Sequence, residues 1–513
     1  METQKYSKKQ RYFLPIYCLA VSFLFLMVCS KSSFLYTMND WPDVNIYYTL
    51  GRGIAEGQVP YRDLFEQKGP LLFFIYALAY LLSPTNYLGA FFLEVLSFAI
   101  LLLYIYKISR LYLGTKSSAF LLPVFSMLLV TSDCFYYGGS AEEFVLPMLA
   151  AGLYHLLKYF KNDANIPVSY KIIFINGVFA GCVFWIKYTM LGFWFAWMAS
   201  LFFIMLSRRQ IARALYSCVA FLGGMLLASL PILLYFLANN ALGELFHTYF
   251  YVNLFSYTEH ISFLHRLLML LYLPAWHIGQ DIFMSFFLVF GLLSFTIQSC
   301  YLPKNYMRLS LLSCLLFLDL SVFFRGTTYI YYFFVFTPFT ILGLISAFHF
   351  FRAKFCQKKN SPFISAVIVI VFAICFGGTW LLSPNTQAIG IDKQDYAQFR
   401  FAEIIRREPD ATLLCCNMMD DGFYYIADIY PTEKFFCRFN LPEEYFPEQY
   451  EQHRQAIKEK RTTYLILKSK TALKDDEFPK DHAWVSETYE YIDRATQFHE
   501  HSDATYLLYR ART

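Results

Sequence analysis

The sequence predicts a polytopic α-helical membrane protein of about 11–13 transmembrane or re-entrant helices, followed by a C-terminal α/β domain. Hydrophobic residues make up 57% of the 513 and charged residues only 16%, whereas a soluble protein carries about a quarter charged residues. Long apolar runs recur from Phe13 to Leu382, and the charge density rises after Pro384. We therefore expect a transmembrane domain at 1–384 and an extracytoplasmic domain at 385–513.

The first apolar stretch, 13–30, follows the basic flank KYSKKQR. A cleaved signal peptide is the competing interpretation, but the stretch is long and no small-x-small cleavage site precedes Lys31. We expect a retained signal anchor whose N-terminus lies in the cytoplasm.

The later apolar segments alternate with short charged gaps. They run at approximately 70–82, 87–106, 118–134, 141–157, 172–186, 189–206, 214–237, 266–299, 309–324, 331–351 and 362–382. Basic residues gather in alternate gaps, as in 107–116 and 208–213, and the positive-inside rule places these gaps in the cytoplasm. The protein is thus expected in the plasma membrane, with residues 385–513 outside. The net charge of +5 reflects this orientation and does not indicate nucleic acid as a partner.

Segment 70–82 has about thirteen residues, which is short for a membrane span. Only an odd number of crossings can separate an outer loop at 31–69 from a cytoplasmic Lys107, so we expect 70–82 to be re-entrant or interfacial. The alternative is two true crossings and a basic outer loop at 107–117.

The C-terminal region has the pattern of a small α/β domain. QDYAQFRFAEIIRREP and PEEYFPEQYEQHRQAIKEK have helical periodicity, whereas ATLLCCN and TTYLILK are short buried-strand candidates. No Gly-rich phosphate loop follows either strand, so a nucleotide site is not indicated. Cys437 could form a disulfide with Cys415 or Cys416; the alternative is that all three are buried thiols.

The first external loop, 31–69, is the most informative segment. From Asp40 to Leu72 the chain carries five carboxylates and three cations. A turn between two membrane segments needs no such charge, so a reaction or a binding event is expected here.

Asp43 follows the first span closely, with Asp40 three residues earlier. The run GRGIAEGQVPYRD occupies 51–63, and Glu66-Gln67-Lys68-Gly69-Pro70-Leu71 ends the loop. In these features the chain resembles the GT-C membrane glycosyltransferases, and especially glycosyltransferase family 39, which includes protein O-mannosyltransferases and lipid A aminoarabinose transferases. Gly69 stands where the family has the first of two prolines, a replacement that we associate with bacterial members. The likeness in segment order covers 1–382.

The resemblance implies a GT-C-like fold and an inverting transfer of a hexose or pentose from a polyprenyl phosphate. Inversion needs one base that deprotonates the acceptor hydroxyl. Asp43 is the candidate base, with Asp40 in reserve and Glu66 as a further catalytic candidate. The alternative is that Asp40 and Asp43 only cap a helix, because Asp is a good N-cap residue.

The leaving lipid phosphate needs positive charge near the outer face. Four basic residues lie near membrane segments on that side and are the candidates for binding it: Lys68, Arg52, Lys187 and Arg325. Lys187 lies in an otherwise apolar stretch, where a lysine is costly unless it has a partner or snorkels to the interface. Snorkelling is therefore the alternative to a function at this position.

A second acidic group, Glu142 and Glu143, follows the turn formed by Gly138 and Gly139. Acids in the first turn of a helix are favoured by its dipole alone, which is the structural alternative. The functional interpretation is that Glu142, Glu143 and Asn253 bind the acceptor or, with Glu66, a metal. Hard oxygen ligands suit Mg²⁺ or Mn²⁺, so a divalent cation is an open expectation and its identity is unknown.

The sequence thus predicts an inverting glycosyltransferase that uses a polyprenyl-phosphate sugar and decorates an envelope glycan, lipid or protein outside the bacterial plasma membrane. A transporter or flippase of lipid-linked glycans is the main alternative. It would show polar residues spread through the helices and internal symmetry, and no duplication is evident. A non-catalytic envelope scaffold is a third class.

Overall fold

The computed structural model describes residues 8–162, 166–256, 262–326, 328–355, 363–474, 476–499 and 502–512. The chain forms two compact units that are interleaved in sequence. Unit 1 comprises Met1–Ser33, Phe91–Pro231 and Ile261–Gln387, whereas unit 2 comprises Phe34–Ala90, Ile232–His260 and Ala388–Thr513. Much of the first external loop therefore groups with the C-terminal residues. The division of the chain into a transmembrane domain at 1–384 and an extracytoplasmic domain at 385–513 stays a prediction.

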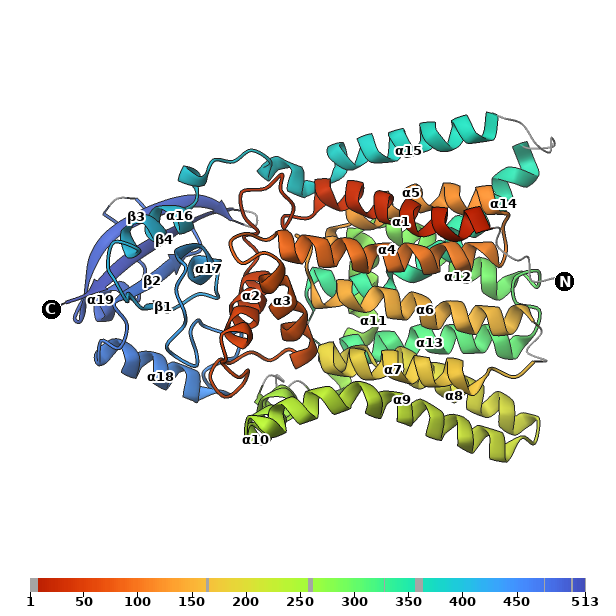
Figure 1. Cartoon of the computed structure of the whole chain (residues 1–513), viewed down its shortest axis with the longest axis horizontal. Helices are drawn as coiled ribbons and strands as arrows, with labels where there is room; N and C mark the ends of the chain where they lie inside the picture. Colours follow the sequence, from red (N-terminus) through yellow and green to blue (C-terminus); the bar gives the residue numbers. More distant parts are fainter. Residues whose placement is uncertain are drawn as a thin grey trace. The chain divides into compact units, whose positions relative to one another are not determined.

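Unit 1 is built from long helices that run side by side (Figure 1). Every predicted apolar segment of this unit forms helix. The helices are α1 (Lys8–Cys29), α4 (Leu88–Arg110), α5 (Thr115–Val130), α6 (Ala141–Lys161), α7 (Tyr170–Lys187), α8 (Gly192–Ser207), α9 (Ile211–Ala238), α11 (Phe263–Gln280), α12 (Ile282–Ile297), α13 (Asn305–Phe323), α14 (Thr340–Phe355) and α15 (Phe363–Leu382). The first residues of α4 and the last of α9 belong to unit 2.

The prediction of one segment at 266–299 is wrong, because the chain forms two helices there, α11 and α12. Asp281 separates them, and its side chain accepts a hydrogen bond from the backbone N–H of Met284. A single helix of that length would span about 50 Å, well beyond the roughly 30 Å of a bilayer core. The segment at 331–351 also differs, since it begins as a 3-10 helix, η4 (Ile330–Phe339), before α14.

Among the described residues, five helices are long and apolar enough to cross a membrane: Leu88–Arg110, Tyr170–Met190, Ile211–Ala238, Asn305–Phe323 and Ile330–Phe351. Further apolar helices are shorter, such as Thr115–Val130 and Gly192–Ser207. Large apolar side chains on α9, including Leu226 and Leu230, are exposed. Such a surface is stable in lipid and costly in water, and the chain is accordingly a multi-pass membrane protein.

Unit 2 contains a helix that the sequence analysis raised only as an alternative. The segment 40–72 was expected to be a polar loop, but residues 42–55 form α2 (Pro42–Ala55), almost all of which is buried. It packs on α3 (Pro70–Leu82) at Gly51, where a Cβ would lie only 2.5 Å from the backbone carbonyl carbon of Tyr76. With 13 residues, α3 is about 20 Å long, so an interfacial position for it remains the prediction.

The C-terminal part of unit 2 is an α/β fold around a four-stranded sheet of order β1-β2-β4-β3 (Figure 1). Strand β1 (Leu413–Cys415) runs parallel to β2 (Tyr464–Ser469), and the antiparallel hairpin β3 (Tyr489–His499) and β4 (Ser502–Ala511) completes the sheet. Both predicted strands are confirmed as β1 and β2, and both predicted helices as α16 (Ala397–Ile405) and α18 (Pro447–Lys458). The β3–β4 hairpin was not anticipated.

Shorter elements complete unit 2. They are α10 (Leu242–Phe246), the π-helix η3 (His247–Ser256), α17 (Phe423–Ala427) and α19 (His482–Val485). Leu414, Leu465 and Leu507 are fully buried in the core between sheet and helices. Cys415, Cys416 and Cys437 are free and buried, which agrees with the thiol interpretation and not with a disulfide.

Candidate active site

Helix α2 places Asp43 in a buried first turn. Pro42 occupies the start of the helix, where its missing N–H costs nothing, and Trp41 is the N-cap residue without a side-chain cap bond. Asp43 therefore does not cap the helix, so the capping alternative is wrong for this residue. Its carboxylate is favoured by the helix dipole and accepts a hydrogen bond of 3.1 Å from the hydroxyl of Tyr47, one turn further on.

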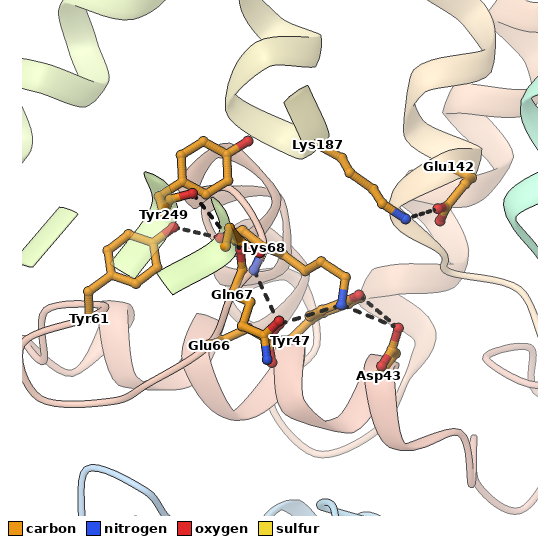
Figure 2. A network of polar contacts seen from close by, with 10 residues as sticks. Asp43, Tyr47, Tyr61, Glu66, Gln67, Lys68, Glu142, Lys187 and Tyr249 are labelled. Atoms are coloured by element: carbon orange, nitrogen blue, oxygen red, sulfur yellow. Dashed lines mark hydrogen bonds and ion pairs between the residues drawn. The ribbon is translucent and has the colours of Figure 1, made fainter. Parts of the chain in front are cut away.

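The second carboxylate, Glu66, shares a lysine with Asp43 (Figure 2). The Lys68 Nζ lies 3.5 Å from Glu66 Oε1 and 3.7 Å from Asp43 Oδ2. The backbone N–H of Lys68 also donates to Glu66 Oε1 at 3.2 Å. We refer to Asp43, Glu66 and Lys68 as the acid–lysine cluster, which unites three residues that the sequence singled out separately.

The backbone around Lys68 is fixed by side chains from other elements (Figure 2). The Tyr61 hydroxyl donates to the carbonyl of Lys68 at 2.6 Å. Asn253, from η3, donates to the carbonyl of Gln67 at 2.7 Å and to that of Tyr249 at 3.0 Å. Tyr61 has a φ of 69°, a conformation that is costly for a residue with a Cβ and is often found at functional sites.

Glu66 and Asp43 differ in their electrostatic surroundings. Glu66 is only 3% exposed. Burial raises the pKa of Glu66 above its ordinary value, Lys68 offsets part of this increase, and the charge of Asp43 adds to it. Because two carboxylates share one cation, a proton taken up by the cluster is expected to reside on Glu66.

Two predicted site residues of the same loop, Asp40 and Arg52, make contacts with other groups. Asp40 is buried. Burial raises the pKa values of the Tyr87 and Tyr396 hydroxyls, and the charge of Asp40 adds to this increase. Arg52 lies nine residues after Asp43 on α2, about 14 Å along the helix axis. The structure thus brings Asp43, Glu66 and Lys68 together, and the roles of Asp40 and Arg52 stay predictions.

Arg52 is held by residues of the C-terminal part of unit 2. Its Nη2 donates to Asp428 Oδ1 at 2.7 Å, and its guanidinium carbon lies 3.9 Å from the ring centre of Tyr430. One turn earlier, the Thr49 hydroxyl donates to Asp420 Oδ2 at 2.8 Å. These contacts fix the C-terminal half of α2, whose first turn carries Asp43.

Unit 1 contains the other predicted residues. The Lys187 Nζ lies 2.5 Å from Glu142 Oε1 (Figure 2) and 3.6 Å from the ring centre of Tyr332. The burial of both charged groups is therefore compensated, so Lys187 does not simply snorkel to an interface. Arg325 donates to the hydroxyl of Tyr188 at 3.2 Å.

Glu142 and Glu143 lie in the first turn of α6, as expected. Ser140 caps this helix by accepting from the N–H of Glu143, and Glu143 Oε2 accepts from the N–H of Gly139 at 2.8 Å. Gly138 and Gly139 have φ values of 84° and 82°, which confirms the tight turn. The helix terminus therefore accounts for Oε2 of Glu143, whereas its Oε1 is buried without a hydrogen-bond partner.

The residues predicted to bind Mg²⁺ or Mn²⁺ are Glu66, Glu142, Glu143 and Asn253. Within the described ranges, no group of three or more His, Cys, Asp or Glu residues could hold a metal ion. Glu142 is neutralised by Lys187, and Glu66 by Lys68. Two of the predicted ligands thus already pair with lysines, and a divalent cation stays a prediction.

Sequence reasoning missed several tyrosines around the charged groups. Tyr47 could have been found, since it lies four residues after Asp43 and such residues share a helix face. Tyr61, Tyr332 and Tyr430 approach their partners only through tertiary structure. In a chain with 41 tyrosines, none of these stood out.

Comparison with known families and structures identifies the chain. The model of the competence-induced Ccs4 N-terminal domain family matches residues 1–378. The chain belongs to this family. The family description names no chemical reaction, and no curated protein matches this Ccs4-family chain in sequence.

Two solved structures of ArnT share the fold of this Ccs4-family protein at low sequence identity. ArnT from Cupriavidus metallidurans bound to undecaprenyl phosphate is 11% identical, with 98% of each chain covered and a TM-score of 0.56. In the apo state ArnT is 10% identical, with 96% of this chain and 97% of ArnT covered and a TM-score of 0.55. The archaeal oligosaccharyltransferase from Archaeoglobus fulgidus gives a TM-score of 0.49 at 12% identity, covering 90% of this chain and 70% of its own. The Ccs4-family chain therefore shares its overall fold with ArnT.

Proposed function

We propose that this protein is an inverting glycosyltransferase that moves a sugar from a polyprenyl-phosphate-linked donor to a cell-envelope acceptor outside the plasma membrane. The acid–lysine cluster carries the proposal: two buried carboxylates and one shared cation lie together in a GT-C fold. ArnT, with the same fold, has been seen with undecaprenyl phosphate bound, which supports a lipid-phosphate donor here.

The cluster supplies the groups that such a transfer needs. Asp43 takes the proton of the acceptor hydroxyl as the acceptor oxygen forms a bond to the anomeric carbon. The bond from that carbon to the phosphate oxygen breaks, and the polyprenyl phosphate leaves with the electron pair and its negative charge. Lys68 is the cation of the cluster and offsets that charge. Glu66 keeps Lys68 in place when the phosphate departs.

Replacement of the base is the decisive test. Asp43→Asn keeps the size of the side chain but removes its basicity, and a general base contributes about 10²–10⁴-fold to the rate. We expect sugar transfer to fall by that factor with normal membrane insertion. The measurement is mass spectrometry of envelope glycans and lipids from cells that lack the gene and are complemented with wild-type or variant protein.

Asp63→Asn is the matched control. Asp63 lies in the same loop but bonds Arg62 and the N–H of Val59, so its amide variant should retain transfer. Full activity of Asp43→Asn would remove Asp43 as the base. A gene deletion that leaves envelope glycans unchanged but blocks movement of a lipid-linked glycan across the membrane would favour the flippase alternative.

A further inference from the structure

The C-terminal part of unit 2 contains a pocket of about 370 Å³, within the range of about 300–1,000 Å³ that is usual for small-molecule sites. It opens where Cys416 and Asn417 follow β1, at the carboxyl end of the parallel pair β1–β2. Ligands of α/β sheets bind at this end of the strands. The pocket shares no residue with the acid–lysine cluster.

One wall of the pocket is a rigid group of polar side chains beside an indole ring. Asp481 accepts from Asn417 Nδ2 at 3.0 Å and from the Trp484 indole N–H at 3.4 Å. Asn417 is itself fixed on β2, because its Oδ1 accepts from the N–H of Lys468 at 2.8 Å and its Nδ2 donates to the Lys468 carbonyl at 3.1 Å. An amide and a carboxylate are thus held in position before any ligand arrives.

The lining also contains an arginine that lies on an aromatic ring. The Arg438 guanidinium lies 4.7 Å from the ring centre of Tyr450 and donates to its hydroxyl at 3.1 Å. At the rim, Arg454 pairs with Glu443 at 2.7 Å, and both side chains are about half exposed (55% and 52%). An exposed pair of this kind contributes little to stability, so both groups can turn to a ligand at small cost.

His453 and Gln449 also line the pocket, and the polar atoms of both side chains bond to backbone groups. Both ring nitrogens of His453 face backbone carbonyl oxygens, of Cys416 at 3.2 Å and of Phe435 at 2.6 Å. Gln449 is fully buried and bonded to the backbone of Phe439 and Leu441. These two side chains therefore offer no free cation for a phosphate and no open ligand set for a metal.

The pocket combines donors, acceptors and aromatic surface without an excess of charge. Arg438 and Arg454 are balanced by Asp481 and Glu443. An anion alone would use only the two arginines, whereas sugar hydroxyls both donate and accept hydrogen bonds and the C–H faces of sugar rings pack on aromatic side chains. We propose that this pocket binds a carbohydrate of one or two sugar residues.

Binding of a glycan here is independent of catalysis, and only its use as the acceptor rests on the proposed function. The full-length protein in detergent is applied to an array of neutral, amino-sugar and acidic oligosaccharides, and the best ligand is titrated. We expect specific binding that Arg438→Ala and Asp481→Asn each weaken at least tenfold. Lys470→Ala, an exposed change in the same domain, should leave it intact.

The outcomes separate the two proposals. Asp43→Asn should bind the glycan as the wild type does, even if transfer is lost. Glycan binding without any transferase activity overturns the proposed function and supports the pocket. A wild-type protein that binds no glycan on the array, or binding that neither pocket variant weakens, overturns the pocket. Binding of inorganic phosphate that competes fully with the glycan would also overturn it, since it would define an anion site.

Discussion

At the scale of residues, one ammonium group serves two buried carboxylates. Lys68 attracts Asp43 and Glu66 over nearly equal distances of 3.7 and 3.5 Å. At an effective dielectric constant of 20, each attraction is worth about 4 kcal/mol before the cost of desolvation. Loss of Lys68 would therefore leave both buried carboxylates without this shared counter-ion.

Removal of the lysine should damage catalysis more than folding. In Lys68→Ala the two carboxylates lose their shared counter-ion, so one of them is expected to stay protonated to a higher pH. We expect kcat/KM for a polyprenyl-phosphate donor to fall about 10²–10³-fold and the acidic limb of its pH profile to move upward. Lys393→Ala, in an exposed part of unit 2, is the control. An unchanged donor KM in Lys68→Ala would contradict a phosphate-binding role.

The buried carboxyl group of Asp420 should make the stability of the protein depend on pH. Burial raises the pKa of Asp420 to about 6, while an unfolded chain has the ordinary value, so the folded state binds the proton more tightly. Stability due to this proton is gained as pH falls through about 6, by at most about 3 kcal/mol. The Tm of the wild type minus that of Asp420→Asn should therefore increase as the pH is lowered from 7 to 5. The exposed Asp503→Asn should show no such trend.

At the scale of elements, α2 connects Asp43 to the C-terminal residues of unit 2. Its first turn holds Asp43, and its last turns are fixed by Arg52–Asp428 and Thr49–Asp420. A rigid helix transmits a displacement at one end to the other. The contacts of Arg52 therefore hold the far end of the helix that carries Asp43.

Two variants distinguish positioning by Arg52 from binding of a donor phosphate. If Arg52 positions α2, Arg52→Ala and Asp428→Asn should both reduce kcat several-fold and leave the donor KM unchanged. If Arg52 binds phosphate, Arg52→Ala should raise the donor KM while Asp428→Asn resembles the wild type. Steady-state kinetics with purified donor measure both. Arg400→Ala, which breaks an ion pair with Asp493 elsewhere in the domain, is the control.

At the scale of the whole molecule, the chain is a multi-pass membrane protein whose orientation follows only from its basic loops. Single cysteines at the exposed positions Gly57, Glu448 and Gly114 test it, in a background where the exposed Cys300 is replaced by Ser. We expect an impermeant maleimide to label 57 and 448 in intact cells, and 114 only after permeabilisation. Labelling of 114 in intact cells would reverse the orientation and support a basic outer loop at 107–117.

Sequence predicted those parts of the molecule whose physics is local. Apolar runs located the membrane helices, and Gly138 with Gly139 located a turn. The helix α2 escaped notice because its buried face is made of tyrosines and glycines rather than a regular apolar stripe; Gly51, for example, is needed only for contact with α3. The likeness in the first loop singled out Asp43, Glu66 and Lys68. The pairing of Lys68 with both carboxylates depends on the tertiary structure, which sequence spacing alone could not reveal.

The sharing of Lys68 also has a consequence for the order in which substrates are used. An anionic donor phosphate competes with both carboxylates for the same ammonium group. In the proposed transfer, a donor phosphate held by Lys68 would leave Asp43 with a smaller share of the positive charge. We therefore expect the donor to bind before the acceptor, an order that steady-state kinetics can measure.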